Sequence, residues 1–112
     1  MISDACLNAM RDTAETREDG IVLVNSTGVK VATMTDTPDT VTWDTTIVGK
    51  LELAADITYS IEAGEEVAGW RAVDSGDVLD FGEDFVSAEN YSNAGEFVLE
   101  AINTYLDVSE NV

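Results

Sequence analysis

Residues 57–81 read ITYSIEAGEEVAGWRAVDSGDVLDF, in which short apolar runs are separated by turn residues. In the first run, Ile57, Tyr59 and Ile61 alternate with polar residues, which is typical of a strand that buries one face. A second apolar run, Val67–Val73, and a third, shorter one follow after glycine-containing turn segments. Because no helical segment separates these runs, the pattern predicts antiparallel strands.

The same pattern extends in both directions along the chain. Ile21–Val24 and Val29–Met34 flank an Asn-Ser-Thr-Gly turn cluster, which predicts a hairpin. Further on, we expect a loop at Glu83–Glu89 and one long strand from Glu96 to about Val108. Short strands at a spacing of about eight to twelve residues favour a sandwich or a barrel. The expected fold is therefore mainly β: an antiparallel β-sandwich, jelly-roll-like or immunoglobulin-like, with one short N-terminal helix.

The N-terminal segment predicts that helix, from Ser3 to Glu18. Ser3 is a suitable N-cap and Gly20 a typical helix stop. A thin apolar stripe recurs along the helix at three- and four-residue steps: Ile2, Cys6, Ala9 and Met10. A short helix with so thin a stripe needs a partner surface, so these four residues are interface candidates. The partner is either the chain's own sheet or another subunit.

The length of 112 residues fits a single domain. Within it we expect residues 1–19 to form the helix, residues 20–108 the sandwich and residues 109–112 a loose tail. The start, MISDACLNAM, lacks the basic and apolar regions of a signal peptide. This predicts synthesis in the cytoplasm without a cleaved leader.

The charge balance is the strongest compositional signal. Asp and Glu number 23 against 5 Lys and Arg, a formal net charge of −18. Such a surface repels nucleic-acid phosphates and anionic membranes, so neither is an expected partner. Self-repulsion of this size is relieved when the Debye length shrinks to about 3 Å near 1 M salt. The acidic surplus therefore predicts a protein of a halophilic host.

The missing residue types exclude several kinds of site. The chain has no histidine and one cysteine, which excludes Ser-His-Asp and Cys-His catalysis and cysteine zinc sites. Glycoside hydrolysis needs two carboxylates in one cleft, and nothing in this sequence indicates which two would share one. We expect no enzyme activity and no cofactor.

The densest acidic segment contains three candidate cation ligands, Asp74, Asp77 and Asp80. Carboxylate oxygens on one loop can hold Ca²⁺ or Mg²⁺. The segment lacks the ligand spacing of an EF-hand, and a solvated acidic turn is the simpler explanation in so acidic a chain.

The aromatic residues leave two interpretations open. They could form a platform for a sugar, or they could pack in the core or at a subunit interface: Trp43, Tyr59, Trp70, Tyr91 and Tyr105. Arg71 follows Trp70 and is the only cation after Lys50. We expect Arg71 to form a charge-assisted pair with a carboxylate and, with Trp70, to have a structural role.

Two segments carry a resemblance to a known family: GWRAVDSGDVLDFG, residues 69–82, and NAGEFVLEAINTYL, residues 93–106. The chain resembles small virion proteins, built as a helix followed by a sandwich, of tailed viruses of bacteria and haloarchaea. The resemblance implies a structural role on the capsid surface, at the head–tail joint or in the tail. It implies a homo-oligomer that binds other virion proteins, is made in the host cytoplasm and resides in the virion. The alternative is a carbohydrate- or cation-binding β-sandwich module.

Overall fold

The computed structural model describes residues 2–31, 41–74 and 78–108. The elements, in chain order, are α1 (Asp4–Arg17), β1 (Glu18–Val24), β2 (Trp43–Asp44), β3 (Lys50–Leu53), β4 (Ile57–Ile61), β5 (Glu66–Asp74), β6 (Leu79–Asn90), β7 (Gly95–Leu99), the 3₁₀ helix η2 (Ala101–Asn103) and β8 (Tyr105–Asp107). The prediction of a mainly β chain with one N-terminal helix is confirmed.

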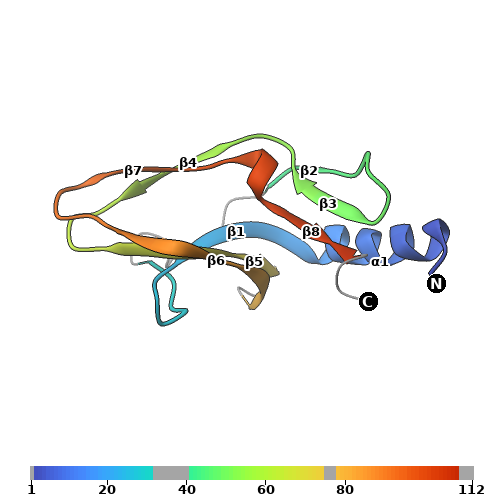
Figure 1. Cartoon of the computed structure of the whole chain (residues 1–112), viewed down its shortest axis with the longest axis horizontal. Helices are drawn as coiled ribbons and strands as arrows, with labels where there is room; N and C mark the ends of the chain where they lie inside the picture. The colour runs from blue at the N-terminus through green and yellow to red at the C-terminus, as the bar shows by residue number, and fades with distance from the viewer. Residues whose placement is uncertain (1, 32–40, 75–77, 109–112) are drawn as a thin grey trace.

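The strands form small antiparallel sheets in two layers. One layer is the sheet β1-β5-β6, and the other contains the sheets β2-β3-β8 and β4-β7 (Figure 1). The molecule is elongated, 48 × 27 × 24 Å, and α1 lies at one end of it (Figure 1). The chain crosses between the layers from β4 to β5 and again from β6 to β7 (Figure 1).

The core lies between the layers and is built around β5, the central strand of its sheet. Trp70 on β5 is 1% exposed and meets the Phe81 ring of β6 edge-to-face, at 6.0 Å between ring centroids. The buried cluster consists of Ile21, Leu23, Val31, Leu53, Ile61, Val67, Trp70, Ala72 and Leu99. Burial of aliphatic and aromatic side chains from both layers is what holds the layers together.

The helix begins as predicted and ends differently. The Ser3 hydroxyl accepts a hydrogen bond from the Cys6 N–H at 3.2 Å, which confirms the N-cap. At the other end, Glu18 is already extended and pairs with Asp74 of β5. The helix therefore passes directly into β1, and Gly20 is a buried residue inside that strand. The prediction that Gly20 stops the helix is wrong because strand pairing takes over two residues earlier.

The expected loop at Glu83–Glu89 is also wrong, since β6 runs through it. In the register of β5 with β6, Val67 pairs with Glu89 and Gly69 with Asp84, so β6 carries extra residues there. Phe85 lies in this bulge and stacks on Phe97 of β7 at 5.5 Å between centroids. Packing of Phe85 on the second layer keeps the segment ordered despite its charge.

The long final strand is broken in the structure. After β7, Asp56 accepts a hydrogen bond from the Ala101 N–H at 2.8 Å, and η2 turns the chain. The chain then leaves its pairing with β4 and pairs with β3 as β8. The alternating pattern of residues 96–108 is common to both strands and does not reveal the change of partner.

The predicted hairpin is present as far as the structure describes it. The Val31 N–H donates to the Leu23 carbonyl at 3.0 Å, and Gly28 adopts φ +78° in the turn. Residues 32–34 of the expected second arm, and the tail at residues 109–112, lie outside the described residues.

Candidate functional site

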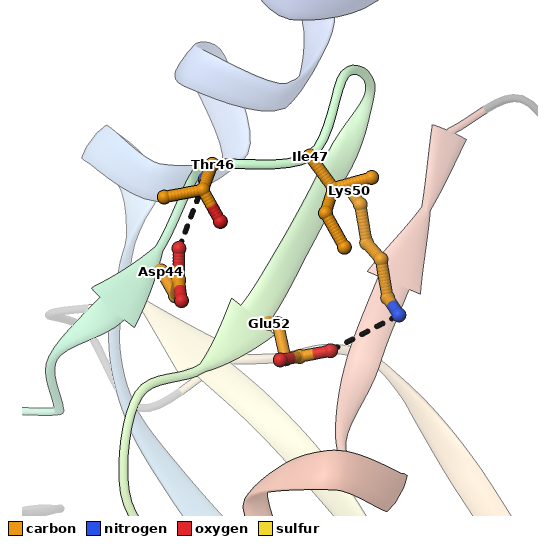
Figure 2. Close-up of a pocket in the computed structure, with 5 residues that line it drawn as sticks. All are labelled: Asp44, Thr46, Ile47, Lys50 and Glu52. Atoms are coloured by element: carbon orange, nitrogen blue, oxygen red, sulfur yellow. Dashed lines mark hydrogen bonds and ion pairs between the residues drawn. The ribbon is translucent and has the colours of Figure 1, made fainter.

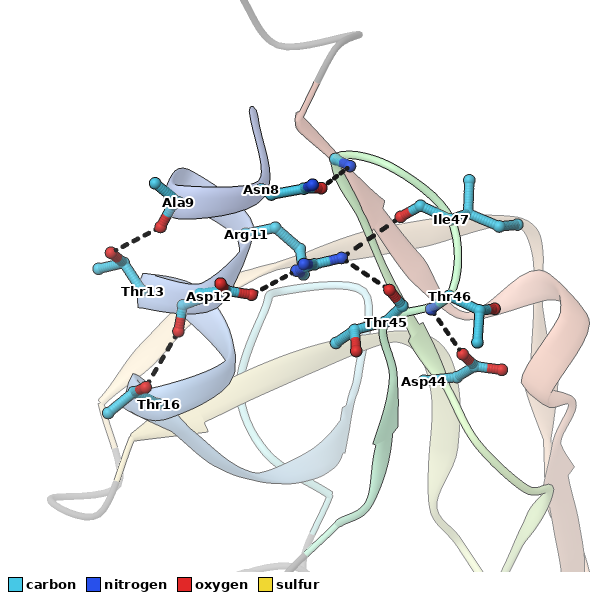
Figure 3. A network of polar contacts seen from close by, with 11 residues as sticks. Asn8, Ala9, Arg11, Asp12, Thr13, Thr16, Asp44, Thr45, Thr46 and Ile47 are labelled. Atoms are coloured by element: carbon cyan, nitrogen blue, oxygen red, sulfur yellow. Dashed lines mark hydrogen bonds and ion pairs between the residues drawn. The ribbon is translucent and has the colours of Figure 1, made fainter. Parts of the chain in front are cut away.

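The helix α1 contacts the body through Leu7, Asn8 and Arg11. Asn8 accepts a hydrogen bond from the Gly49 N–H at 3.0 Å, and Leu7 lies against the same glycine. Arg11, 7% exposed, donates from Nη1 to the Thr45 carbonyl at 2.9 Å and reaches the Ile47 carbonyl at 3.4 Å. Figure 3 shows this arginine between α1 and the turn that follows β2. Two backbone carbonyls of that turn are thereby satisfied by one buried guanidinium.

The four interface candidates lie away from these contacts. Cys6, Ala9 and Met10 are exposed, and Ile2 is half-buried. At about 100° per residue, Ala9 is directed away from the side that carries Leu7, Arg11 and Ala14, whereas Cys6 and Met10 lie on its flank. The sequence did not show that Leu7, Asn8 and Arg11 would form the docking side of the helix.

A shallow hollow, too small to hold a water molecule, lies beside the same turn, between β2 and β3 (Figure 2). The Asp44 carboxylate accepts from the Thr46 N–H at 2.9 Å, and this hydrogen bond is the main cause of its lowered pKa. Lys50 and Glu52 form an ion pair at 3.0 Å, and Lys50 also lies 4.1 Å from the centre of the Tyr105 ring. The hydrogen bond to Glu52 raises the pKa of Lys50. These groups contact one another, so the hollow has no polar group directed at a ligand.

Arg71 forms the charge-assisted pair that we expected. Its Nη2 lies 2.7 Å from Asp84 Oδ1, and its Nη1 donates to the Trp70 carbonyl at 2.8 Å. A weaker contact reaches the Glu83 carbonyl at 3.3 Å. The arginine thus joins β5 to the edge strand β6 next to the buried Trp70.

The aromatic residues do not share an exposed surface. Of the five platform candidates, all of which the structure describes, Trp70 is buried and Tyr105 is exposed. The other three pack partly buried against the core: Trp43, Tyr59 and Tyr91. Their indole and phenol groups are hydrogen-bonded to backbone carbonyls. Core packing is therefore the interpretation that the geometry favours.

The carboxylates of Asp74 and Asp80 converge on Arg17. Arg17 Nε lies 2.7 Å from Asp80 Oδ2, and its Nη2 lies 3.1 Å from Asp80 Oδ1 and 3.4 Å from Asp74 Oδ2. This guanidinium holds the pKa of Asp80 below its usual range. The third candidate, Asp77, lies outside the described residues. Arg17 is therefore the cation that the two described candidates face, and we assign no metal to them.

The residue that sequence reasoning missed is Glu18. Its side chain is 1% exposed, and Oε1 lies 3.6 Å from Arg17 Nε. Burial, followed by the hydrogen bond and charge of Asp80, raises its pKa to about 8. Oε2 is buried without a hydrogen-bond partner among the described residues. Position 18 is unremarkable in so acidic a sequence, and its neighbours in space are 56 and 62 residues further along the chain.

The described residues contain no candidate metal centre and no candidate membrane-spanning helix. No group of three acidic or cysteine side chains in residues 2–31, 41–74 and 78–108 has the geometry to hold a metal ion. Within the same ranges, no helix is long and apolar enough to cross a membrane. Comparison with family models, curated proteins and solved structures gave no match for this chain.

Proposed function

We propose that this chain is a structural component of a tailed-virus particle from a halophilic host. It acts by self-association and by binding other virion proteins, on the capsid surface, at the head–tail joint or in the tail. The support is the resemblance of residues 69–82 and 93–106 to small virion proteins, together with the acidic surplus. The proposal assigns no reaction and no cofactor to the chain.

The observation that carries the proposal is the orientation of α1. The helix docks through Asn8 and Arg11 and leaves the stripe of Cys6, Ala9 and Met10 exposed. An amphipathic helix ordinarily turns its apolar side toward its own core. Here Leu7 lies against the body, but Cys6, Ala9 and Met10 face outward, on an arm at one end of an elongated molecule (Figure 1). Small side chains allow a close approach of another helix, and the same surface is present on every copy.

Further apolar side chains are available for other neighbours. On the layer that carries β7 and η2, Val98 is 50% and Ile102 72% exposed. Val86, in the bulge of β6, is fully exposed. Single exposed apolar residues are common on soluble proteins, but several on different elements suit a component with more than one neighbour.

Size exclusion with light scattering in several-molar salt tests self-association. We expect the chain to exceed its monomer mass of 12.0 kDa. Ala9→Glu and Met10→Glu place a carboxylate in the stripe and should give monomers. Ser92→Glu is the matched control, because it adds the same charge at an exposed position in the turn between β6 and β7, at the end of the molecule opposite α1 (Figure 1). A wild-type chain that stays monomeric at high concentration, or equal behaviour of all three variants, would exclude the α1 interface.

The virion assignment has its own test. Mass spectrometry of purified particles of the encoding virus should find the chain at a fixed ratio to the major capsid protein. A map of the intact particle should then show it in the shell, the joint or the tail. Its absence from purified particles would contradict the assignment even if the chain self-associates.

A further inference from the structure

The carboxyl group of Glu18 lies at the junction between the helical arm and the body. Because α1 passes into β1 without a loop, Glu18 is at once the C-cap of the helix and the first residue of the strand. Its N–H donates to the Ala14 carbonyl in the last turn of α1, and its own carbonyl accepts from the Trp43 indole at 3.4 Å. Any movement of Glu18 is therefore transmitted to both the helix and the strand.

Three charged groups face this carboxyl among the described residues, one from each element packed against it. They are Arg17 at the end of α1, Asp74 at the end of β5 and Asp80 near the start of β6. Arg17 directs its short hydrogen bonds to Asp80 and is only 3.6 Å from Glu18 Oε1. The single guanidinium is thus shared by three carboxyl groups.

The two protonation states of Glu18 differ in the hydrogen bonds and in the charge balance of this junction. When Glu18 is protonated, its O–H donates to the Asp80 carboxylate, and Arg17 neutralises Asp80 while reaching Asp74. When the proton leaves to solvent, that donor is lost and three carboxylates surround one cation. The negative charge then lies partly on Oε2, which is buried and has no partner in the described structure. An unpaired buried charge is strongly unfavourable.

We propose that Glu18 is a proton-controlled latch, which holds the last turn of α1 against β5 and β6 when protonated and releases it when ionised. Release lets water reach the Glu18 carboxylate and separates Arg17 from Asp80. The raised pKa of Glu18 agrees with a latch that is closed at neutral pH and opens in alkaline solution. If α1 is the interface proposed above, the latch also sets how its exposed stripe is presented; the latch itself does not depend on that role.

Nuclear magnetic resonance in several-molar salt tests the latch directly. The side-chain carboxyl carbon of Glu18 is followed from about pH 3 to about pH 10, a range that spans its ordinary and raised pKa values. Hydrogen exchange at the amides of the last turn of α1 is measured over the same range and corrected for the intrinsic effect of base. We expect Glu18 to titrate above neutrality, and opening of the last turn to increase by about tenfold or more on ionisation.

Matched variants separate the latch from a general effect of pH. Glu18→Gln keeps a donor for Asp80 and cannot ionise, so its α1 opening should be independent of pH. Glu15→Gln removes an exposed carboxylate of the same helix and should behave as wild type. Asp80→Asn removes the neighbouring negative charge and frees Arg17 for Glu18, so the Glu18 midpoint should move to lower pH. This variant keeps the test valid if Glu18→Gln does not fold.

Three results would overturn the latch. They are titration of Glu18 near its ordinary value, the same alkaline opening in Glu18→Gln as in wild type, and an unchanged midpoint in Asp80→Asn. The series is repeated in the Ala9→Glu background, in which the proposed α1 interface is disrupted. If the latch persists there while oligomers are absent, the latch does not depend on the proposed α1 interface.

Discussion

Arg17 Nε lies 2.7 Å from Asp80 Oδ2, although 63 residues separate the two along the chain. Arg17 is the last residue of α1, and Asp80 is the second residue of β6. This contact places positive charge near the C-terminal end of the helix, where the helix dipole favours a cation. It also brings the helix terminus beside Glu18 and Asp74, so the stability of this junction depends on protonation.

Stability should fall with rising pH because of Glu18. Its pKa is raised from 4.5 to about 8 on folding, so between these values the folded state binds one proton more than the unfolded state. The free energy of unfolding should therefore decrease by about 1.4 kcal/mol per pH unit in that window from this group. The contribution is complete below pH 4.5 and lost above about pH 8. Urea unfolding at constant high salt measures the slope, which Glu18→Gln should flatten and Glu15→Gln should retain.

The opposite dependence is expected in acid. The pKa of Asp80 is lowered from 3.8, chiefly by its hydrogen bond with Arg17. Its contribution is therefore present above pH 3.8 and lost as the pH falls through the lowered value. Asp80→Asn should lose this acid-sensitive part of the stability. An acid unfolding curve identical to that of wild type would show that the Arg17–Asp80 pair adds nothing to the folded state.

Gly82→Ala should separate β6 from β5. A Cβ at this position would overlap the Trp70 carbonyl oxygen and lie 2.9 Å from Arg71 Cα, both of which belong to the backbone of the central strand. Neither can move without breaking the strand pairing, so we expect destabilisation of about 2 kcal/mol or more. Gly64→Asn is the control, since nothing lies within 4 Å of that Cβ and Asn tolerates its φ of +89°. Equal thermal midpoints for both variants would contradict the close approach.

Arg11→Met should destabilise the docking of α1. The change removes the donors for the Thr45 and Ile47 carbonyls at a position that is 7% exposed, and Met fills much of the same volume. The Thr45 carbonyl loses this donor, which costs about 1–3 kcal/mol for a buried acceptor, whereas the Ile47 carbonyl keeps the Lys50 N–H at 3.1 Å. The side chain of its other partner, Asp12, is 59% exposed. Asp12→Asn should therefore change the urea midpoint little. If Arg11→Met were as stable as Asp12→Asn, docking would not depend on the arginine.

Transfer to low salt should unfold the chain. The surplus of negative charge, −18 from 23 acidic and 5 basic residues, repels itself over about 10 Å at 0.1 M salt and over about 3 Å at 1 M. Far-ultraviolet circular dichroism during dialysis should show loss of β-structure, and return of salt should restore it. Retention of the full signal below about 0.1 M salt would contradict the adaptation to brine.

Local signals account for the features that were predicted correctly. The Ser3 cap, the strand at Ile57–Ile61 and the strand around Trp70 depend on spacing within a few residues. The proximity of Asp74 to Asp80 is also local, because a short connection joins their strands. Among the candidate site residues, the pairing with a carboxylate was predicted for Arg71, whereas the pairing of Asp74 and Asp80 with the distant Arg17 was not.

The sequence did not reveal the features that depend on residues far away along the chain. The segment at Glu83–Glu89 has many acids and looks like a loop, yet Phe85 packs on Phe97 and the strand continues. Residues 96–108 alternate like one strand, yet Asp56 turns the chain toward β3. Alternation records which side chains are buried, and it carries no information about which strand lies beside them.

The sequence by itself determined the mainly β character, the start of the helix, the central strand and the acidic surface. These follow from local periodicity, capping and composition. Only the tertiary structure decided that α1 docks through Arg11 and that Glu18 lies buried among Arg17, Asp74 and Asp80. The physical reason is that burial of a charged group depends on partners brought from elsewhere in the chain. Nothing in a sequence with 23 acidic residues identifies the carboxyl group that becomes buried in the folded protein.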